Sequence, residues 1–282
     1  ANKSKLNYMT KSNDLKQFWT RGNLHLRVRE AMIEANLIDK KLEIEDLFPI
    51  DQYHARGIAA TVDLGKRMPI SKGNKILDIG CGLGGPARYY AKKFECFITG
   101  IDITPSFIEL GNEFNQLTSM SNKIDLKVGN GEILELEDNT FDGAYSQHVT
   151  MNVAQRDRFF SEAYRVLKKG SFFAFTEHGL GPLGDPIFPL PWADSESMSY
   201  LLPPEETISI LKKIGFTDIE IIKTGDKYMS GYEKLVNKTN DTIPPTLGIH
   251  VIGGPSMIER SKNSLKSIKE KRTLPFEVLC KK

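Results

Sequence analysis

The sequence contains only three cysteines, Cys81, Cys96 and Cys280, and their spacing shows no pairing pattern. A disulfide framework is therefore not expected, and a reducing cytoplasm is the default location. Histidine is also scarce, with five residues, and none of them stands in a metal-ligand pattern with cysteine or glutamate. We therefore expect no metal site.

The chain also lacks long apolar runs and an excess of charge of either sign. No stretch approaches the ~20 apolar residues that a membrane-spanning helix needs, and no signal peptide is visible. The formal net charge is only +2, which provides no basic field for nucleic acid. With 40% hydrophobic and 26% charged residues among 282, the composition is typical of a soluble protein of one large domain or one and a half.

The most informative stretch is KILDIGCGLGG, residues 75–85, which runs from an apolar strand through a glycine loop into a predicted helix. Gly80, Gly82 and Gly84 alternate across the loop. Glycine lets the backbone approach a ligand because no Cβ stands in the way, and the following helix offers free N–H groups. The pattern alone does not identify the ligand, since Gly80, Gly82 and Gly85 also fit the G-x-G-x-x-G dinucleotide spacing.

Two acids narrow the choice of ligand. Asp78 lies at the carboxyl end of the strand, where it would repel a pyrophosphate but suit the ammonium and sulfonium of S-adenosylmethionine. Its alternative role is to cap the N–H groups of the loop, and the two roles can coexist. Asp102 ends the next strand, roughly 20 residues after Gly80, as expected for an acid on ribose hydroxyls; alternatively it caps the helix that begins near Pro105. An acid that binds ribose hydroxyls would suit NAD equally well, so Asp102 does not distinguish the two ligands. The argument against an NAD-dependent oxidoreductase therefore depends on Asp78.

These segments resemble the successive motifs of class I S-adenosylmethionine-dependent methyltransferases, in the family's order, over roughly residues 70–222. Within that superfamily the chain resembles the sarcosine/dimethylglycine and the ubiquinone/menaquinone-biosynthesis small-molecule methyltransferases. The motifs that carry the resemblance are LDIGCGLGG, the acid in GIDITP, GNGEIL at 129–134, FDGAYSQHV at 141–149, AYRVLKKGSFFAFTE at 163–177 and, ahead of the core, DQYHARGIAAT at 51–61.

The alternation of strands and helices from Lys75 onward predicts an α/β fold with a parallel sheet covered on both faces. The resemblance implies a Rossmann-like, mostly parallel seven-stranded sheet. We expect an N-terminal arm and accessory helices over 1–70, in which 1–23 is a mobile arm or lid and DKKLEIEDLFPID is a connection. An S-adenosylmethionine-binding domain would follow over 71–282, with a helical insertion at 224–273. Gly170 is expected to stop a helix over 155–167.

The resemblance assigns the donor site to the carboxyl ends of the strands. Asn130, Gly131 and Glu132 follow the third strand and would hold the adenine, although the family often has aspartate at the position of Asn130. Glu132 is alternatively a favourable charge at a helix N-terminus. The predicted donor-binding residues are Asp78, Gly80, Cys81, Gly82, Gly84, Asp102, Ile103, Asn130, Gly131, Glu132 and Gln147.

Three candidate bases follow neighbouring strands. His148 lies where donor and acceptor meet in the family, and it would orient the acceptor or take a proton; a structural histidine is the alternative. Glu177 and His178 follow the fifth strand, and we expect both to face the cleft. An amine acceptor must be neutral to react, whereas a carbon or phenol acceptor needs a base.

The acceptor is the least determined part of the prediction. The first hypothesis is N-methylation of an amine or amino acid such as sarcosine or dimethylglycine by in-line displacement. In this hypothesis Arg56 binds a carboxylate and aromatic faces stabilise the ammonium. The candidate substrate-binding residues are Tyr53, His54, Arg56, Tyr145, His148, Trp192 and Tyr200.

Two other functions stay open. A C- or O-methyltransferase of a quinone or other lipid-like ring would use the apolar segments 183–192 and 246–252 as its pocket. A non-catalytic S-adenosylmethionine-binding scaffold belongs to another class of protein. In each case we expect a small-molecule partner, no nucleic acid, and possible assembly with a second copy. The loop at 179–200, rich in glycine and proline, is interpreted as a cover over the substrate.

Overall fold

The structure is a computed structural model that describes residues 17, 23–38, 40–240 and 245–282. The arm or lid expected over residues 1–23 lies outside the described residues, except for Gln17 and Asn23. No helix within these ranges is long and apolar enough to cross a lipid bilayer.

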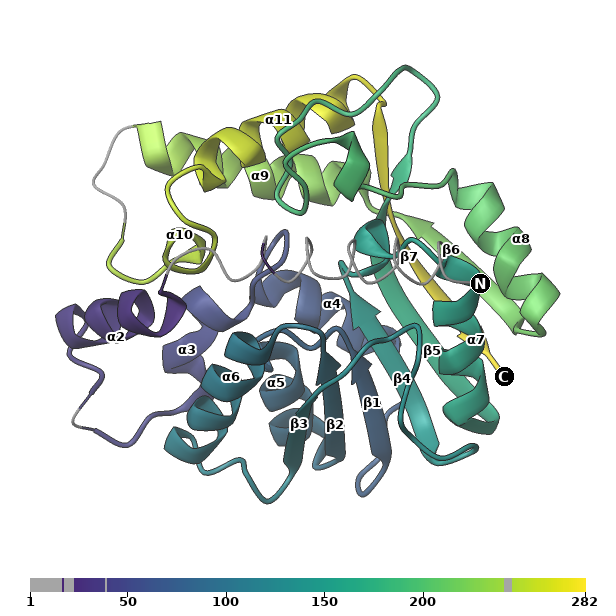
Figure 1. Ribbon diagram of the computed structural model, residues 1–282, viewed down its shortest axis with the longest axis horizontal. Helices are drawn as coiled ribbons and strands as arrows, with labels where there is room; N and C mark the ends of the chain where they lie inside the picture. Colours follow the sequence, from purple (N-terminus) through teal and green to yellow (C-terminus); the bar gives the residue numbers. More distant parts are fainter. Residues whose placement is uncertain (1–16, 18–22, 39, 241–244) are drawn as a thin grey trace, which may run out of the picture.

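In the described part of the chain, seven strands form one sheet in the order β3-β2-β1-β4-β5-β7-β6 (Figure 1). The first five strands are parallel, and β7 runs antiparallel to both β5 and β6. This arrangement confirms the predicted Rossmann-like, mostly parallel sheet. The strands are β1 Lys75–Ile79, β2 Phe97–Asp102, β3 Ile124–Val128, β4 Phe141–Gln147, β5 Leu167–Leu180, β6 Thr217–Lys223 and β7 Thr273–Lys281.

The apolar strand β1 is buried on both faces because helices cover both sides of the sheet. Its Leu77 and Ile79 point into one hydrophobic cluster, whereas Ile76 points into another. Side chains alternate along a strand, and a strand buried on both faces is apolar at nearly every position. The first cluster lies under α7 Arg156–Val166 and α8 Pro204–Ile214, and the second lies under α4 Ile58–Arg67, α5 Gly85–Phe94 and α6 Pro105–Leu117.

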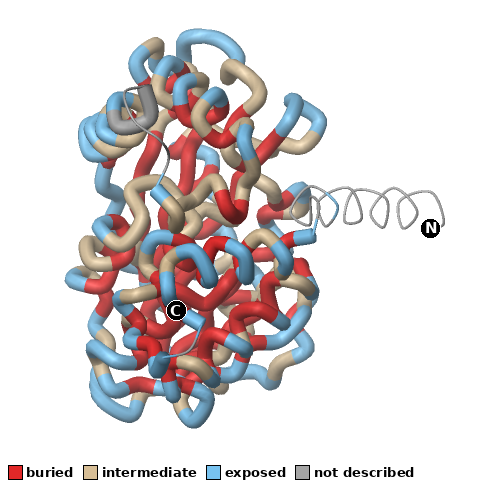
Figure 2. Tube along the Cα trace, turned by 90° about the vertical axis from the view of Figure 1, so that its left-hand side faces the viewer, coloured by how far each residue is buried: buried red, intermediate tan, exposed pale blue. Residues whose placement is uncertain are grey.

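A smaller lobe covers the carboxyl ends of the strands (Figures 1 and 2). It contains α9 Gly225–Asn240, α10 Ile249–Gly253 and α11 Met257–Lys269, all between β6 and β7. The loop after β5 packs on α11, where the Arg260 guanidinium donates to the Leu190 carbonyl oxygen. The N-terminal helix α2 Leu24–Glu34 also joins this lobe, because Arg27 donates to the carbonyl oxygens of Val251 and Ile252 in α10.

Two local expectations were wrong. Residues 39–51, expected to be a connection, contain helix α3 Ile44–Asp51, which begins with a capping box between Glu43 and Asp46. Pro49 lies in the last turn of this helix. Gly170 does not stop a helix: α7 ends at Val166, and Gly170 adopts φ +80° in the irregular start of β5, where the register with β4 shifts.

A buried ion pair joins α3, α5 and α6. Arg88 and Asp51 are both 0% exposed, and their side chains are 3.1 Å apart. The same guanidinium donates to the Leu83 carbonyl oxygen in the glycine loop, to the Gly111 carbonyl oxygen and to Asn115 Oδ1. Because Arg88 serves four partners at once, it holds the loop and the N-terminal segment in a fixed relation.

We expect Arg88→Met to lower the free energy of unfolding by about 3–5 kcal/mol, because it leaves the Asp51 carboxylate buried without its partner. Urea denaturation followed by circular dichroism measures the change. Lys92→Met, one turn later in α5, is the control, since Lys92 pairs with Glu45 at the surface and such pairs contribute about 1 kcal/mol or less. If Arg88→Met lowers the free energy of unfolding no more than Lys92→Met does, the buried ion pair does not hold the glycine loop and the N-terminal segment together.

Candidate functional site

The glycine loop between β1 and α5 needs glycine for two different reasons. Gly80, at φ +85°, packs so closely on Val149 that a Cβ would overlap the valine side chain. Gly82, at φ +52°, would place a Cβ in open space, so there the backbone conformation is the only constraint. Gly84, at φ +74°, is the N-cap of α5 and packs against Leu126.

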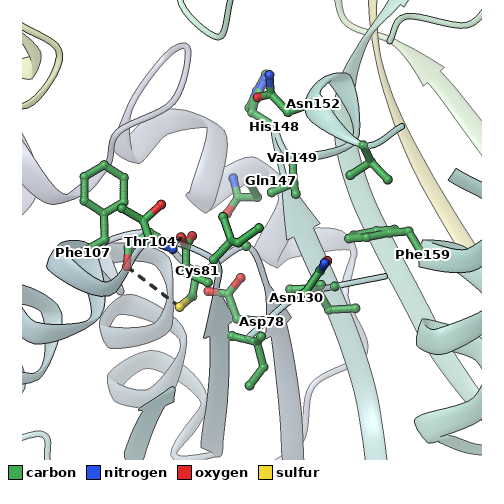
Figure 3. A pocket seen from close by; sticks show the side chains of 18 of the residues that line it. Asp78, Cys81, Thr104, Phe107, Asn130, Gln147, His148, Val149, Asn152 and Phe159 are labelled. Carbon is green, nitrogen blue, oxygen red and sulfur yellow. Dashed lines mark hydrogen bonds between the residues drawn. The ribbon is translucent and has the colours of Figure 1, made fainter. Parts of the chain in front are cut away.

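A first cavity of about 320 Å³ lies above this loop, at the carboxyl ends of β1, β2 and β4. Figure 3 shows Asp78 and Asn130 near the strand ends, with His148 and Asn152 at the opposite end of the cavity. Of the predicted donor-binding residues only Gly84 is not part of the lining. The others that line the cavity are Asp78, Gly80, Cys81, Gly82, Asp102, Ile103, Asn130, Gly131, Glu132 and Gln147.

Asp78 is a buried carboxyl group at the base of this cavity. The Tyr145 hydroxyl donates to its Oδ2 at 2.7 Å. Burial raises the pKa of Asp78 to about 8, against the hydrogen bond from Tyr145, which lowers it, and the nearby Asp102 adds to the rise. A neutral carboxyl group at this position would ionise on contact with a cation, so the site is suited to a positively charged group.

Asp102, rather than Asp78, holds the glycine loop. Its carboxylate accepts hydrogen bonds from the N–H of Gly82 at 2.8 Å and from the N–H of Thr104 at 2.9 Å. Thr104 is the N-cap of α6, so Asp102 braces the loop and the start of the helix together while it lines the cavity.

Two further polar groups of the lining have unused hydrogen-bonding capacity within the described residues. Gln147 Nε2 and Asp51 Oδ1 are buried without a hydrogen-bond partner. Buried polar atoms are normally paired, and an unpaired one is costly. A ligand with both a donor and an acceptor group would therefore satisfy this cavity.

A second cavity of about 710 Å³ lies between the sheet and the smaller lobe and is mostly apolar. Tyr53, His54 and His148 line both cavities, so the two meet at these side chains. The walls of the second cavity come from segments far apart in sequence and include Arg56, Met151, His178, Trp192, Tyr232 and Met257.

His148 occupies the junction in a conformation that non-glycine residues rarely adopt, at φ +57°. Its Nε2 lies 2.6 Å from the hydroxyl of Tyr228, a buried residue of α9. Its ring lies 5.9 Å from that of His54 and 5.6 Å from that of His178, between centroids. These contacts fix the orientation of the imidazole.

The three histidines are neutral at physiological pH. Desolvation lowers the pKa of His54 to about 4 and that of His178 to about 3. The pKa of His148 falls well below its ordinary value, first through desolvation and then through the neighbouring His178 and His54. A neutral imidazole with so low a pKa is a weak base, so these rings can accept a proton only from a strongly acidic group.

Three predicted residues face neither cavity. Glu177 was expected to face the cleft, and this is wrong: it is fully buried in an ion pair with Arg156 at 2.8 Å and accepts a hydrogen bond from Thr150. Tyr145 does not present its ring to an acceptor, because it lies beneath Asp78 in the core. Gly84 packs within the protein, as described above.

Two residues that were predicted to bind the acceptor line different cavities. Tyr200 lines the first cavity, whereas Trp192 lines the second.

Several lining residues were not found from the sequence. Asp51 and Phe107 belong to the first cavity. Tyr232 and Met257 line the second cavity, and Tyr228 contacts His148; all three come from the insertion, whose helices gave no functional signal. The segments 183–192 and 246–252 were expected near the cleft, and Pro191, Trp192 and Ile249 do line the second cavity. Among the described residues, no group of histidine, cysteine and acidic side chains could hold a metal ion.

Residues 77–175 match the sequence model of a family described as "Methyltransferase domain". This match confirms the predicted resemblance for the segment from β1 to β5. A curated relative, 24-methylenesterol C-methyltransferase 3 of Arabidopsis thaliana, is 37% identical over 116 residues, which are 41% of this chain and 32% of that protein. The matches to the first curated relatives span about a third of those proteins' length.

Solved structures share the fold over nearly the whole chain. Phosphoethanolamine N-methyltransferase 2 of Haemonchus contortus, in complex with phosphomonomethylethanolamine and S-adenosylhomocysteine, matches 95% of this chain and 60% of that chain at 22% identity, with a TM-score of 0.75. Geranyl diphosphate C-methyltransferase of Streptomyces coelicolor A3(2) matches 96% of this chain and 97% of that chain at 14% identity, with a TM-score of 0.70. At these identities the likeness shows the fold alone.

The raised pKa of Asp78 predicts a pH-dependent stability. In the unfolded chain its carboxyl group ionises near pH 4, whereas in the folded protein it ionises near pH 8. Between these values the folded state binds more protons, so the free energy of unfolding falls as the pH rises, by at most about 1.4 kcal/mol per pH unit. Asp78→Asn removes this loss, so the variant gains stability relative to wild type between pH 5.5 and pH 8.5, as measured by urea denaturation.

The control for this prediction is Asp142→Asn. Burial raises the pKa of Asp142, but the hydrogen bonds from Lys168 and from the Lys75 N–H, together with the charges of both lysines, outweigh it, so the pKa is lowered and the group is ionised in both states over this range. The stability difference between Asp142→Asn and wild type should not change between the two pH values. Parallel curves for Asp78→Asn and wild type would contradict the assignment of a raised pKa.

Proposed function

We propose that this chain, which carries a methyltransferase domain, transfers a methyl group from S-adenosylmethionine to a carbon atom of a lipid-like small molecule. The observation that carries the proposal is the junction of two cavities at Tyr53, His54 and His148. A donor bound in the first cavity and an acceptor bound in the second would meet at this junction. Methyl transfer requires such an arrangement, because the acceptor atom must lie in line with the bond that breaks.

The first cavity fits the donor by the chemistry of its lining. Asp78 would bind the ammonium group, Asp102 the ribose hydroxyls, and the unpaired Gln147 amide another polar group. The glycine loop leaves open space at Gly82, where a ligand can approach the backbone. When bound, S-adenosylmethionine supplies an electrophilic methyl group on a sulfonium, which is already activated for displacement.

The size and walls of the second cavity favour a lipid-like acceptor over a small amino acid. At about 710 Å³ the cavity lies within the range that accommodates drug-sized ligands, far more than sarcosine occupies. Trp192, Met257 and Ile249 provide apolar walls. The sequence relatives include sterol C-methyltransferases, which supports carbon methylation over the amine that the sequence first suggested.

The chemistry at the junction follows from the neutral rings. Transfer to an alkene carbon forms a C–C bond, breaks the C–S bond and leaves a positive charge on the acceptor, which then loses a proton. Aromatic faces attract a cation by roughly 0.5–2 kcal/mol each. The ring of His148 is placed to accept the proton, and Tyr228 holds that ring in place.

N-methylation of an amine is the second candidate. The phosphoethanolamine N-methyltransferase shares the fold over most of this chain, and the same ring faces that would stabilise a carbocation also suit an ammonium group.

The test is transfer of label from methyl-labelled S-adenosylmethionine to a panel of acceptors: a sterol with an unsaturated side chain, a prenyl diphosphate, a short-chain quinol, sarcosine, dimethylglycine and phosphoethanolamine. Label in a carbon position of one of the first three supports the proposal. Label in an amine alone moves the assignment to N-methylation. Donor binding by calorimetry without transfer to any acceptor would favour a non-catalytic scaffold, and no donor binding would refute the proposal altogether.

We expect His148→Asn to reduce kcat by about 10²–10⁴-fold, the usual contribution of a general base, with the donor Kd nearly unchanged. Asparagine tolerates the left-handed backbone at this position, so the fold should be preserved. Tyr228→Phe should lower kcat less, because it releases the ring without removing it.

Tyr232→Phe is the matched control. Tyr232 belongs to α9, like Tyr228, and it lines the second cavity, but its hydroxyl is not the one that contacts His148. The lowered pKa of His148 also predicts that wild-type kcat, measured at saturating S-adenosylmethionine so that Asp78 is ionised against the bound ammonium group, is flat from about pH 6 upward. Equal kcat values for His148→Asn and wild type would remove His148 from the chemistry.

A further inference from the structure

Arg56 lines the second cavity with a guanidinium that is only partly used. Nine-tenths of its side chain is buried, at 10% exposure. Its Nη2 donates to Asp63 at 2.6 Å, whereas its buried Nη1 has no hydrogen-bond partner among the described residues. An unpaired buried donor on a charged group is costly, so a site of this kind indicates a missing acceptor.

The charge around Arg56 is not balanced by Asp63. The same carboxylate also contacts Lys227 at 3.0 Å and Lys66 at 3.7 Å, so three cations share one anion. Lys227 and Lys234 line the cavity together with Arg56, and Asp226 is the acid among the lining residues on that side. The balance is positive, which favours an anionic group in this part of the cavity.

The position of Arg56 is also constrained. Its backbone adopts φ +69°, and its guanidinium lies over the Tyr228 ring at 5.7 Å from the centroid. Gly231 in α9 leaves room for the side chain, since a Cβ there would approach Arg56 Cγ to 2.9 Å. A cation held in this way loses little freedom when it binds an anion, which improves affinity.

We propose that the acceptor carries an anionic oxygen group, a carboxylate or a phosphate, which binds the free side of Arg56. The rest of the acceptor is apolar and lies against Trp192 and Met257. This inference rests on the proposed function, because it assumes that the second cavity receives the acceptor. It adds a chemical class to that proposal: an amphiphilic acid rather than a neutral lipid.

Tyr228 sets the spacing between the anion and the reacting atom. Arg56 Cζ lies 5.7 Å from the centroid of its ring, and the His148 ring lies 5.4 Å from the same centroid. The anion-binding group and the base are thus neighbours of a single aromatic ring. The anionic group of the acceptor is therefore expected within a few bonds of the atom that is methylated, and the apolar part extends away from it.

The test uses three probes that share an eight-carbon alkyl group and differ in the head group: octanoate, octyl phosphate and 1-octanol. Each is titrated into the protein by calorimetry, with and without S-adenosylhomocysteine. At least one of the two anions should bind more tightly than octanol, and the tighter one identifies a carboxylate or a phosphate as the group. Arg56→Gln should weaken the anion by about 10- to 100-fold, the range for a hydrogen bond to a charged group, and should leave octanol within about twofold.

Lys66→Gln is the matched control. It removes a positive charge from the same Asp63, but Lys66 is 71% exposed and is not among the residues that line either cavity. Its anion affinity should equal that of wild type. If Arg56→Gln does not fold, Arg56→Lys replaces it: the charge stays but the planar fork is lost, so anion affinity should fall several-fold while that of octanol does not.

Anions that bind wild type no better than octanol, or as tightly to the folded Arg56 variant as to wild type, would overturn the inference. This failure is separable from a failure of the proposed function. If the protein binds S-adenosylmethionine and transfers its methyl group but does not bind anions more tightly than octanol, only the inference of an anionic acceptor is refuted. A protein that binds no donor loses the proposed function, whatever the probes do.

Discussion

The site depends on the buried guanidinium of Arg88. This group contacts the glycine loop through Leu83, α3 through Asp51 and α6 through Asn115, and it is fully shielded from water. A charge at such depth is stable only if its donors are paired, so each of these partners is held at a defined position. Asp51 is followed within three residues by Tyr53 and His54, which line both cavities. One ion pair thus places the floor of the first cavity and the junction relative to each other.

The two cavities contain ionisable groups of opposite charge, an acid in the first and a cation in the second. The first cavity ends in Asp78, whose carboxyl group is poised to ionise beside a cation, and the second cavity contains the cation Arg56. Between them stand imidazole rings that desolvation keeps neutral. If the proposed cationic donor and anionic acceptor bind at these two ends, a charged ring at the junction would attract one and repel the other, whereas a neutral ring does neither.

The sequence predicted the sheet and the first cavity because their signals are local. The run from Lys75 to Gly85 contains the strand, the loop and the helix start in one stretch, and Asp102 follows at a fixed interval. Glu177 and His178 could not both face the cleft, since successive side chains of a strand point to opposite faces. Tyr228 was missed for another reason: it reaches His148 across 80 positions of the chain, and no local pattern records such a contact.

The family match and the acceptor site involve different parts of the chain. The match covers residues 77–175, which contain the glycine loop, Asp102 and His148. The residues that shape the second cavity lie mostly outside it, with Tyr53, His54 and Arg56 before and the insertion after. Similarity over the matched segment therefore concerns the glycine loop, Asp102 and His148, and it does not extend to most of the walls of the second cavity.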